Sequence, residues 1–367
     1  MNVKGDCSMF FSKKGKLNKQ LLNAVKSDDN QALNEAIAQG ADVNATNNAD
    51  NTVLNWALAR ENFAAAHILV DQGADVNKPG SLNATALISL AQCENDQAEI
   101  NTLAQKLLQN GAEINTRDAN GATALQLALM NGNEELAEIL LQAEADIHIK
   151  SQFGDTALSW ACFSGLTDMI CALLDTGADV QWQGHEGNNL LFSAAHNDDD
   201  QIIALLIDRG VDISAINDDG ETPLFAALRA GNVLTALTLA EAGCDVDISN
   251  NEGDTILDMI PDHPIIAHGL KKAADMFAGG HTADALHEVG LAAYSEGLQE
   301  TGLRVLRALT RRFPDHLPTW QIMYQIYTQN EAMDQSIECL VQAARLGDGN
   351  ARNLLKEYGF EMPDSSH

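Results

Sequence analysis

Long apolar runs are missing from this 367-residue sequence. No stretch reaches the roughly 18 apolar residues of a membrane helix, and the N-terminus offers only Met9, Phe10 and Phe11, too few for a secretory signal. We therefore expect a cytoplasmic protein with no membrane span and no classical export signal.

Cations are scarce as well. The chain has 22 Lys and Arg against 52 Asp and Glu, a net charge of −30 and a pI near 4.4. Residues 40–263 alone hold 7 Lys and Arg and 35 Asp and Glu. Phosphate backbones and anionic lipids repel such a surface, so we predict no nucleic-acid or membrane partner. We therefore favour a basic protein as the partner. The alternative is that the negative charge only keeps the protein soluble.

Paired cysteines and histidine clusters are also missing. The six cysteines lie far apart without a C-x-x-C pair, which is typical of reduced core thiols. The pairs His263/His268 and His281/His287 lack the i, i+4 spacing of a helical zinc site. Residues 217–222 (NDDGET) resemble a calcium loop but lack its terminal Glu. We predict no catalytic residue, no cofactor and no metal site.

What the sequence does contain is a repeat. A phrase of the type QGADVN recurs at intervals of 33, 38, 33, 33, 33 and 33 residues. Its second position is held by Gly40, Gly73, Gly111, Glu144, Gly177, Gly210 and Gly243. A second anchor, Thr or Asn followed two residues later by Leu, keeps the same intervals from Thr52 to Thr255. Two anchors on one period are strong evidence for an array of structural repeats.

Each period predicts two short helices joined by a turn and followed by a loop. In one repeat, Leu158 and Ala161 form the first apolar stripe, and Ile170, Leu173 and Leu174 form the second at helical spacing. A helix pair this short cannot bury its own apolar face, so the neighbouring pair must cover it. The glycine suits the left-handed position that often follows a helix.

This pattern resembles the ankyrin repeat, whose signature is T-P-L-H-x-A on a 33-residue period. Residues 222–224 match its start, and Thr85, Thr123 and Thr156 begin T-A-L variants. The position of the motif's histidine is held instead by Asn55, Ile88, Gln126, Ser159, Phe192, Phe225 and Asp258. The resemblance implies an all-α solenoid of about eight repeats over residues 20–272, with loops that project as β-hairpin fingers.

The C-terminal residues follow a different period. Leu286 recurs as Trp320 and Leu306 as Leu340, each 34 residues later. Over residues 273–359 this resembles two tetratricopeptide-type helix pairs with a closing helix, and an irregular helical cap is the alternative. Either arrangement is suited to covering the apolar end of the array.

Three further segments complete the predicted layout. Residues 1–19 form a short basic lead, and residues 360–367 form a tail. The 38-residue interval contains a five-residue insertion, which we place at residues 93–97, in the turn between the two helices of that repeat.

The resemblance also implies where a partner binds, because finger tips and the exposed face of the first helices form the concave surface of ankyrin arrays. Aromatic side chains exposed there are typical of binding hot spots. For Trp182 the alternative is that it folds onto its own hairpin. The predicted partner-binding residues are Phe153, Phe163, Trp182, His185, Glu186, His196, Asp218, Asp219 and Arg229.

Charge patterning adds two candidate surfaces. Residues 196–200 (HNDDD) and 217–221 (NDDGE) are acidic clusters denser than helix capping requires. In contrast, Arg304, Arg307 and Arg311 share one helix face at i, i+3, i+7, with Arg312 beside them. This second surface is suited to an acidic partner or to the acidic end of the array itself.

We therefore predict a non-enzymatic protein that binds a partner protein on its concave surface, as a scaffold or as a masking inhibitor. A two-module adaptor and a structural spacer stay open, as does a hydrolytic enzyme with an unrecognised Cys/His site. The sequence indicates no oligomeric state.

Overall fold

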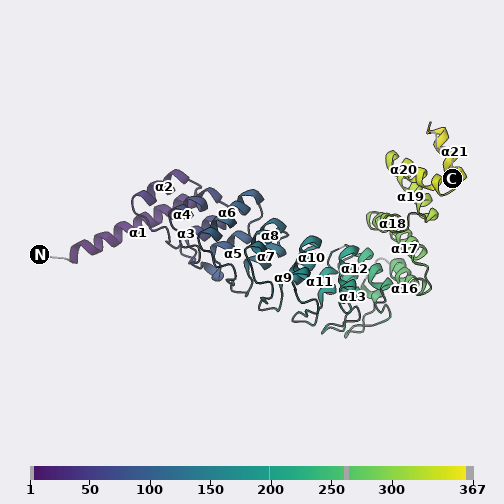
Figure 1. The fold of residues 1–367 in the computed structure, drawn as a ribbon, viewed down its shortest axis with the longest axis horizontal. Helices are drawn as coiled ribbons and strands as arrows, with labels where there is room; N and C mark the ends of the chain where they lie inside the picture. The colour runs from purple at the N-terminus through teal and green to yellow at the C-terminus, as the bar shows by residue number, and fades with distance from the viewer. Residues whose placement is uncertain (1–3, 198, 260–263, 361–367) are drawn as a thin grey trace. The chain divides into compact units, whose positions relative to one another are not determined.

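The computed structural model describes residues 4–197, 199–259 and 264–360 (Figure 1). Asp198 of the predicted acidic cluster, His263 and most of the predicted tail lie outside these residues. The chain divides into two compact units, Met1–His185 and Glu186–His367, and each is described by itself. Regular structure in the described residues is helical, which confirms the all-α prediction.

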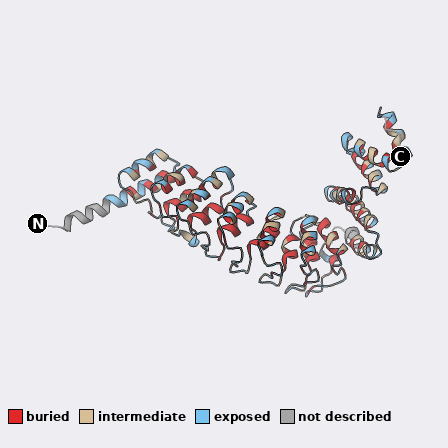
Figure 2. Ribbon diagram, in the orientation of Figure 1, coloured by how far each residue is buried: buried red, intermediate tan, exposed pale blue. Residues whose placement is uncertain are grey.

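The N-terminal unit stacks five helix pairs in series. They are α1 (Lys4–Lys26) with α2 (Asn30–Ala38), α3 (Val53–Leu58) with α4 (Phe63–Asp71), α5 (Ala86–Ala91) with α6 (Gln97–Gln109), α7 (Ala124–Met130) with α8 (Glu134–Gln142), and α9 (Ala157–Ser164) with α10 (Thr167–Asp175). First helices pack against first helices, and second helices against second helices. Buried residues therefore continue from one pair to the next (Figure 2).

The repeated Thr is the N-cap of the first helix in the second to fifth pairs. Oγ1 of Thr52 accepts a hydrogen bond from the amide of Asn55 at 3.0 Å, and Thr123 and Thr156 cap α7 and α9 in the same way. The Leu of the same anchor is buried, as Leu54 shows with 1% exposure. The two anchors thus start the first helix and fix it in the core.

The loops between repeats project as fingers (Figure 1). They are mainly hydrogen-bonded turns rather than the expected β-hairpins, because β pairing in the described residues is limited to isolated bridge positions, Thr46 with Thr52 in one finger and Gln183 and Asn189 in another. One finger contains the short 3-10 helix η1 (Ser81–Asn83).

Other polar side chains replace the missing histidine of the repeat motif. Asn55 Nδ2 donates to the carbonyl of Ala84 in the next finger at 2.8 Å. Gln126 Nε2 donates to the carbonyls of Ile149 and Asp155, at 2.8 and 2.9 Å, on both sides of the following finger. Side chains of α3 and α7 therefore hold the next finger by hydrogen bonds although the motif's histidine is missing.

One repeat has a residue with a Cβ where the others have glycine. Glu144 follows α8 with φ of 61°, close to the φ of 81° at Gly111 and 95° at Gly177. A left-handed backbone costs a residue other than glycine about 1–2 kcal/mol. The predicted left-handed position is confirmed, and Glu144 is strained there.

Two predicted boundaries fall inside helices. The helix α1 runs without a break through residue 19, and Leu17 on it is buried, so the predicted boundary lies within α1. The helix α16 (Pro264–Ala278) likewise spans the boundary placed after Lys272. In both places the helical stretch continues past the point where the repeat period is lost.

The five-residue insertion lies only partly in the predicted turn. The turn between α5 and α6 has five residues, against three between α7 and α8, and α6 has 13 residues against nine in α8. Most of the insertion therefore lengthens α6 by about one turn. Glu61 holds the enlarged turn, because its carboxylate accepts hydrogen bonds from the amide of Glu94 at 2.8 Å and from Nδ2 of Asn95 at 2.5 Å.

The C-terminal unit continues the array and ends in longer helices. Its elements are α11 (Leu190–Ala194), α12 (Asp200–Asp208), α13 (Pro223–Arg229), α14 (Val233–Glu241), α15 (Ile256–Met259), α16, α17 (Thr282–Ser295), α18 (Gln299–Arg312), α19 (Leu317–Gln329), α20 (Met333–Arg345) and α21 (Gly349–Glu357). Helix α14 packs against α16 and α18. The last helices therefore cover the final repeat pair, and both nitrogens of the Arg312 fork bond to Glu241 on α14, at 2.6 and 2.5 Å.

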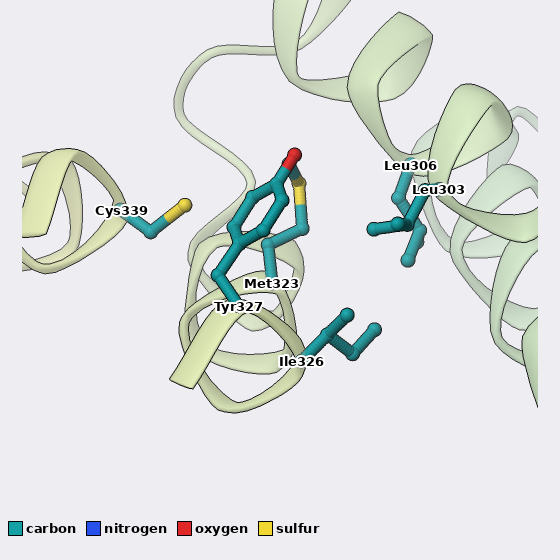
Figure 3. Packing of buried hydrophobic residues seen from close by; sticks show 6 residues of the cluster. All are labelled: Leu303, Leu306, Met323, Ile326, Tyr327 and Cys339. Carbon is teal, nitrogen blue, oxygen red and sulfur yellow. The ribbon is translucent and has the colours of Figure 1, made fainter. Parts of the chain in front are cut away.

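The longer helices form two close pairs, α17 with α18 and α19 with α20, followed by α21. Glycine allows the first pair to approach, because a Cβ on Gly302 would lie 2.6 Å from the amide nitrogen of Tyr294. Between the pairs, Met323, Ile326 and Tyr327 of α19 lie near Leu303 and Leu306 of α18 (Figure 3). The described residues of this segment are helical, and their tetratricopeptide-type arrangement stays a prediction.

Candidate partner-binding surfaces

Two repeat positions carry the exposed apolar side chains of the N-terminal unit. The finger-tip position lies three residues before the N-cap of the first helix, and the helix-end position lies seven residues after it. We call Leu82 and Phe153 the tip row, and Met130 and Phe163 the helix-end row. Their exposed fractions are 75%, 61%, 37% and 43%. The two rows together are the inner surface of this unit.

The finger that carries Phe153 is held in place by a dense set of hydrogen bonds. Ser151 Oγ accepts from the amides of Phe153 and Asp155, both at 3.1 Å, so the turn closes on itself. Gln152 Nε2 reaches the preceding finger and donates to the carbonyl of Ala119 at 2.6 Å. With the bonds from Gln126, the finger is fixed at its base and its tip. Phe153 is therefore an exposed aromatic on a preorganised support.

Trp182 is not the exposed aromatic that the sequence suggested. Its side chain is 3% exposed, and its indole Nε1 donates to the carbonyl of Gly154 at 2.8 Å. Burial removes it as a contact residue, so this part of the prediction is wrong. The alternative was that Trp182 folds onto its own hairpin; the side chain is indeed buried, but its hydrogen bond goes to the preceding finger. Trp182 supports the turn that displays Phe153.

Leu82 is exposed, and its backbone is in a strained conformation. It lies in η1 with φ of 55° and ψ of 25°, a left-handed conformation, and the next residue, Asn83, has φ of 60°. Hydrogen bonds hold the strained turn: the Leu82 carbonyl accepts from the amide of Ala119 at 2.7 Å, and Asn83 Nδ2 donates to the carbonyl of Arg117 at 2.6 Å. Strain at an exposed apolar side chain is typical of a functional position.

The helix-end row lies on neighbouring first helices. Ser164 Oγ of α9 donates to the carbonyl of Met130 of α7 at 3.1 Å, which ties the two helix ends together. Phe163 packs edge-to-face on Trp160, with ring centroids 5.6 Å apart and an interplanar angle of 86°. Trp160 is half-buried, so it supports the exposed ring as well as the packing between repeats.

Ankyrin-repeat models match residues 21–70, 90–183 and 177–250, together more than half of the chain. The chain belongs to the ankyrin-repeat family. The matched ranges end before α17, so the tetratricopeptide resemblance of the last helices rests on their sequence period alone.

Two similar proteins are ubiquitin ligases many times larger than this ankyrin-repeat chain. A stretch of 123 residues is 36% identical to the E3 ubiquitin-protein ligase Ufd4 of Drosophila melanogaster, and 121 residues are 31% identical to the E3 ubiquitin-protein ligase hecd-1 of Caenorhabditis elegans. The matches cover 32% and 33% of this chain and 4% of each ligase. Because the match covers so little of each ligase, it gives no basis for assigning ligase activity to this chain.

The remaining predicted residues of the ankyrin array are exposed but differ in chemistry. His185 ends the N-terminal unit, and Glu186, Asp218 and Asp219 lie on fingers of the C-terminal unit. His196 and Arg229 occupy the helix-end position of their repeats. Tip and helix-end positions are thus mainly charged in the C-terminal unit, whereas in the N-terminal unit four of them carry large apolar side chains and the others hold alanine or the polar Asn120 and Gln92.

Arg229 already has a partner within the ankyrin array. Its guanidinium pairs with the carboxylate of Glu221, whose side chain is 4% exposed, whereas that of Arg229 is 60% exposed. Because a buried carboxylate needs a counter-charge, the first role of Arg229 is to stabilise the folded state rather than to bind a ligand. His196 Nδ1 lies 3.1 Å from the carbonyl of Phe192.

The predicted arginine surface is only partly available. Arg304 and Arg311 are exposed, but Arg307 Nε donates to the hydroxyl of Tyr327 at 2.8 Å, and its guanidinium also lies 3.6 Å from Glu300. This tyrosine hydroxyl helps to raise the pKa of Arg307. Arg307 thus links α18 to α19, and the three predicted cations do not share one environment.

Four cysteines of this ankyrin-repeat protein lack the environment of a nucleophile. Burial raises the pKa of Cys93 and of Cys339 to about 12, and burial also raises that of Cys162 and Cys244. Among the described residues there is no group of three or more His, Cys, Asp or Glu side chains that could hold a metal ion. In the same part of the chain, no helix is both long and apolar enough to cross a membrane.

Leu82 and Met130 were missed by the sequence analysis. The signal that finds them is the repeat itself, because Leu82 aligns with Phe153 and Met130 aligns with Phe163 when the N-cap Thr is the reference. Applying the two offsets to every repeat would have identified both.

Proposed function

We propose that this protein binds a partner protein non-enzymatically through the inner surface of its N-terminal unit. The proposal rests on one observation, which concerns the repeat positions of the exposed hydrophobic side chains. Every large hydrophobic side chain that is exposed in the described part of this unit belongs to the tip row or the helix-end row. Large exposed apolar side chains gathered on one surface are typical of protein-binding sites.

Rigidity supports the same proposal. Binding loses less free energy to ordering when contact residues are already fixed, and the Phe153 finger is fixed by Gln126, Gln152 and Trp182. The protein would thereby act as a scaffold or as an inhibitor that masks its partner. Buried, protonated thiols suit a reducing compartment, which favours the cytoplasm.

For the C-terminal unit we propose a capping role. Helices α17 to α20 are two tetratricopeptide-like pairs in this proposal, and α16 and α18 cover α14, the last complete second helix of the array. Terminal repeats need such cover, because their outer face is otherwise apolar.

Site-specific photo-cross-linking in the native cell tests the binding proposal. A photoreactive phenylalanine analogue is placed at Phe153 or Phe163, and at Glu138, an exposed residue of the second helix α8, as the control. We expect the same discrete adducts from Phe153 and Phe163 and none of them from Glu138. Identical adducts from all three positions, or none from the two phenylalanines, would contradict the proposal.

A further inference from the structure

We infer that the inner surface of the N-terminal unit takes an amphipathic α-helix with basic flanks, which has apolar side chains seven residues apart. This inference rests on the proposed function and specifies its partner. Three properties of the unit lead to it: the width of the inner surface, the spacing of its apolar residues along the array, and its charge.

The width of the inner surface matches the diameter of an α-helix. The finger precedes the N-terminus of each first helix, whereas Met130 and Phe163 lie at the C-terminal ends of α7 and α9. With seven and eight residues, these helices are about 10–12 Å long at 1.5 Å per residue, which sets the distance from the base of the finger to the helix-end row. An α-helix with its side chains is about 10–12 Å across, so it contacts both rows at once. A single extended strand is narrower and covers only one row.

The spacing along the array fits two helical turns. Met130 and Phe163 occupy the same position of adjacent repeats, and neighbouring packed helices lie about 8–10 Å apart. Seven residues of an α-helix span about 10.5 Å and return to nearly the same face. Apolar side chains at i and i+7 of the partner therefore meet Met130 and Phe163 together, while Phe153 contacts the helix from the finger side.

The negative charge of the N-terminal unit determines which side chains flank the apolar residues of the partner helix. Residues 1–185 contain 11 Lys and Arg, six of them lysines of α1, against 23 Asp and Glu. Three of the other cations are held by internal carbonyls: Lys78 Nζ donates to Asn44 at 2.8 Å, and Arg60 and Arg117 donate to other backbone oxygens at 3.1 and 2.6 Å. A fourth, Lys106, pairs with Asp71 at 2.7 Å. The excess carboxylates give the unit a negative field that attracts lysine and arginine and repels an acidic helix.

A displayed library of random peptides tests the inference on the full-length protein. Peptides of about 16 residues span about 24 Å as helices, which is enough for both contacts. Binders are selected on the native protein and counter-selected on the double variant Phe153→Ser, Phe163→Ser. Tyr358→Ser is the matched control, because Tyr358 is a 47% exposed aromatic in the other unit.

We expect the selected peptides to be basic, to carry apolar residues at i and i+7, and to gain helical circular dichroism on binding. Their affinity should fall at least about tenfold on the double variant, stay unchanged on Tyr358→Ser, and weaken as salt is raised. Peptides that need the two phenylalanines but are acidic or extended would overturn the inference and leave the proposed function standing. Peptides that bind the double variant equally well, or a selection without enrichment, would overturn both.

Discussion

Trp182→Phe separates the role of a buried tryptophan in supporting a finger from a role in contacting a partner. The substitution keeps an aromatic side chain at a 3% exposed position but removes the indole donor to the Gly154 carbonyl, a bond of 2.8 Å. A net hydrogen bond contributes about 0.5–1.5 kcal/mol, and the smaller ring leaves a void that adds roughly 1 kcal/mol. We expect the free energy of unfolding to fall by about 1.5–2.5 kcal/mol.

Urea titration followed by circular dichroism measures that loss, with Trp56→Phe as the control at a half-buried tryptophan. Hydrogen exchange supplies the local readout. The amides of Phe153, Gly154 and Asp155 should exchange faster in Trp182→Phe, whereas those of α3 should not change. Equal losses of stability for both tryptophans, or unchanged exchange in the finger, would refute the reasoning that Trp182 supports the display of Phe153.

Three further predictions concern stability. Glu144→Gly should raise the free energy of unfolding by about 0.5–1 kcal/mol through relief of the left-handed strain, and Glu144→Ala, which keeps a Cβ, should not. Arg312→Ala should cost about 0.5–1 kcal/mol by urea titration because its ion pair with α14 is lost, and Arg311→Ala should be nearly neutral. Burial and the neighbouring His316 lower the pKa of His287, so the unfolded state binds more protons near and below pH 6.5. The melting temperature should therefore drop as the pH falls through that range, and His287→Asn should reduce the drop.

The array itself was predictable from the sequence because its signals are local and repeated. The N-cap Thr and the Leu two residues later recur on one period, and the structure places them at the start of a first helix and in its core. The left-handed position of Glu144 followed from the glycines of the other repeats. Such features depend on a few neighbouring residues, so one repeat predicts the next.

The orientation of Trp182 was not predictable in the same way. Its partner, Gly154, lies 28 residues earlier in a different finger, and a loop sequence does not specify which finger its side chain turns to. The predicted boundary after residue 19 lies within α1 for a related reason. Helix α1 continues past the region of apolar periodicity because nothing in residues 4–19 ends a helix, so the period marks the packed part of α1 and not its length.

The dissociation rate of the partner captured by cross-linking tests the central claim most directly. Binding to wild type, to the double variant Phe153→Ser, Phe163→Ser and to Tyr358→Ser is followed by surface plasmon resonance. We predict that the double variant releases the partner at least about tenfold faster with a similar association rate, and that Tyr358→Ser behaves like wild type. A double variant that holds the partner as long as wild type does would contradict the claim that the inner surface of the N-terminal unit is the binding site.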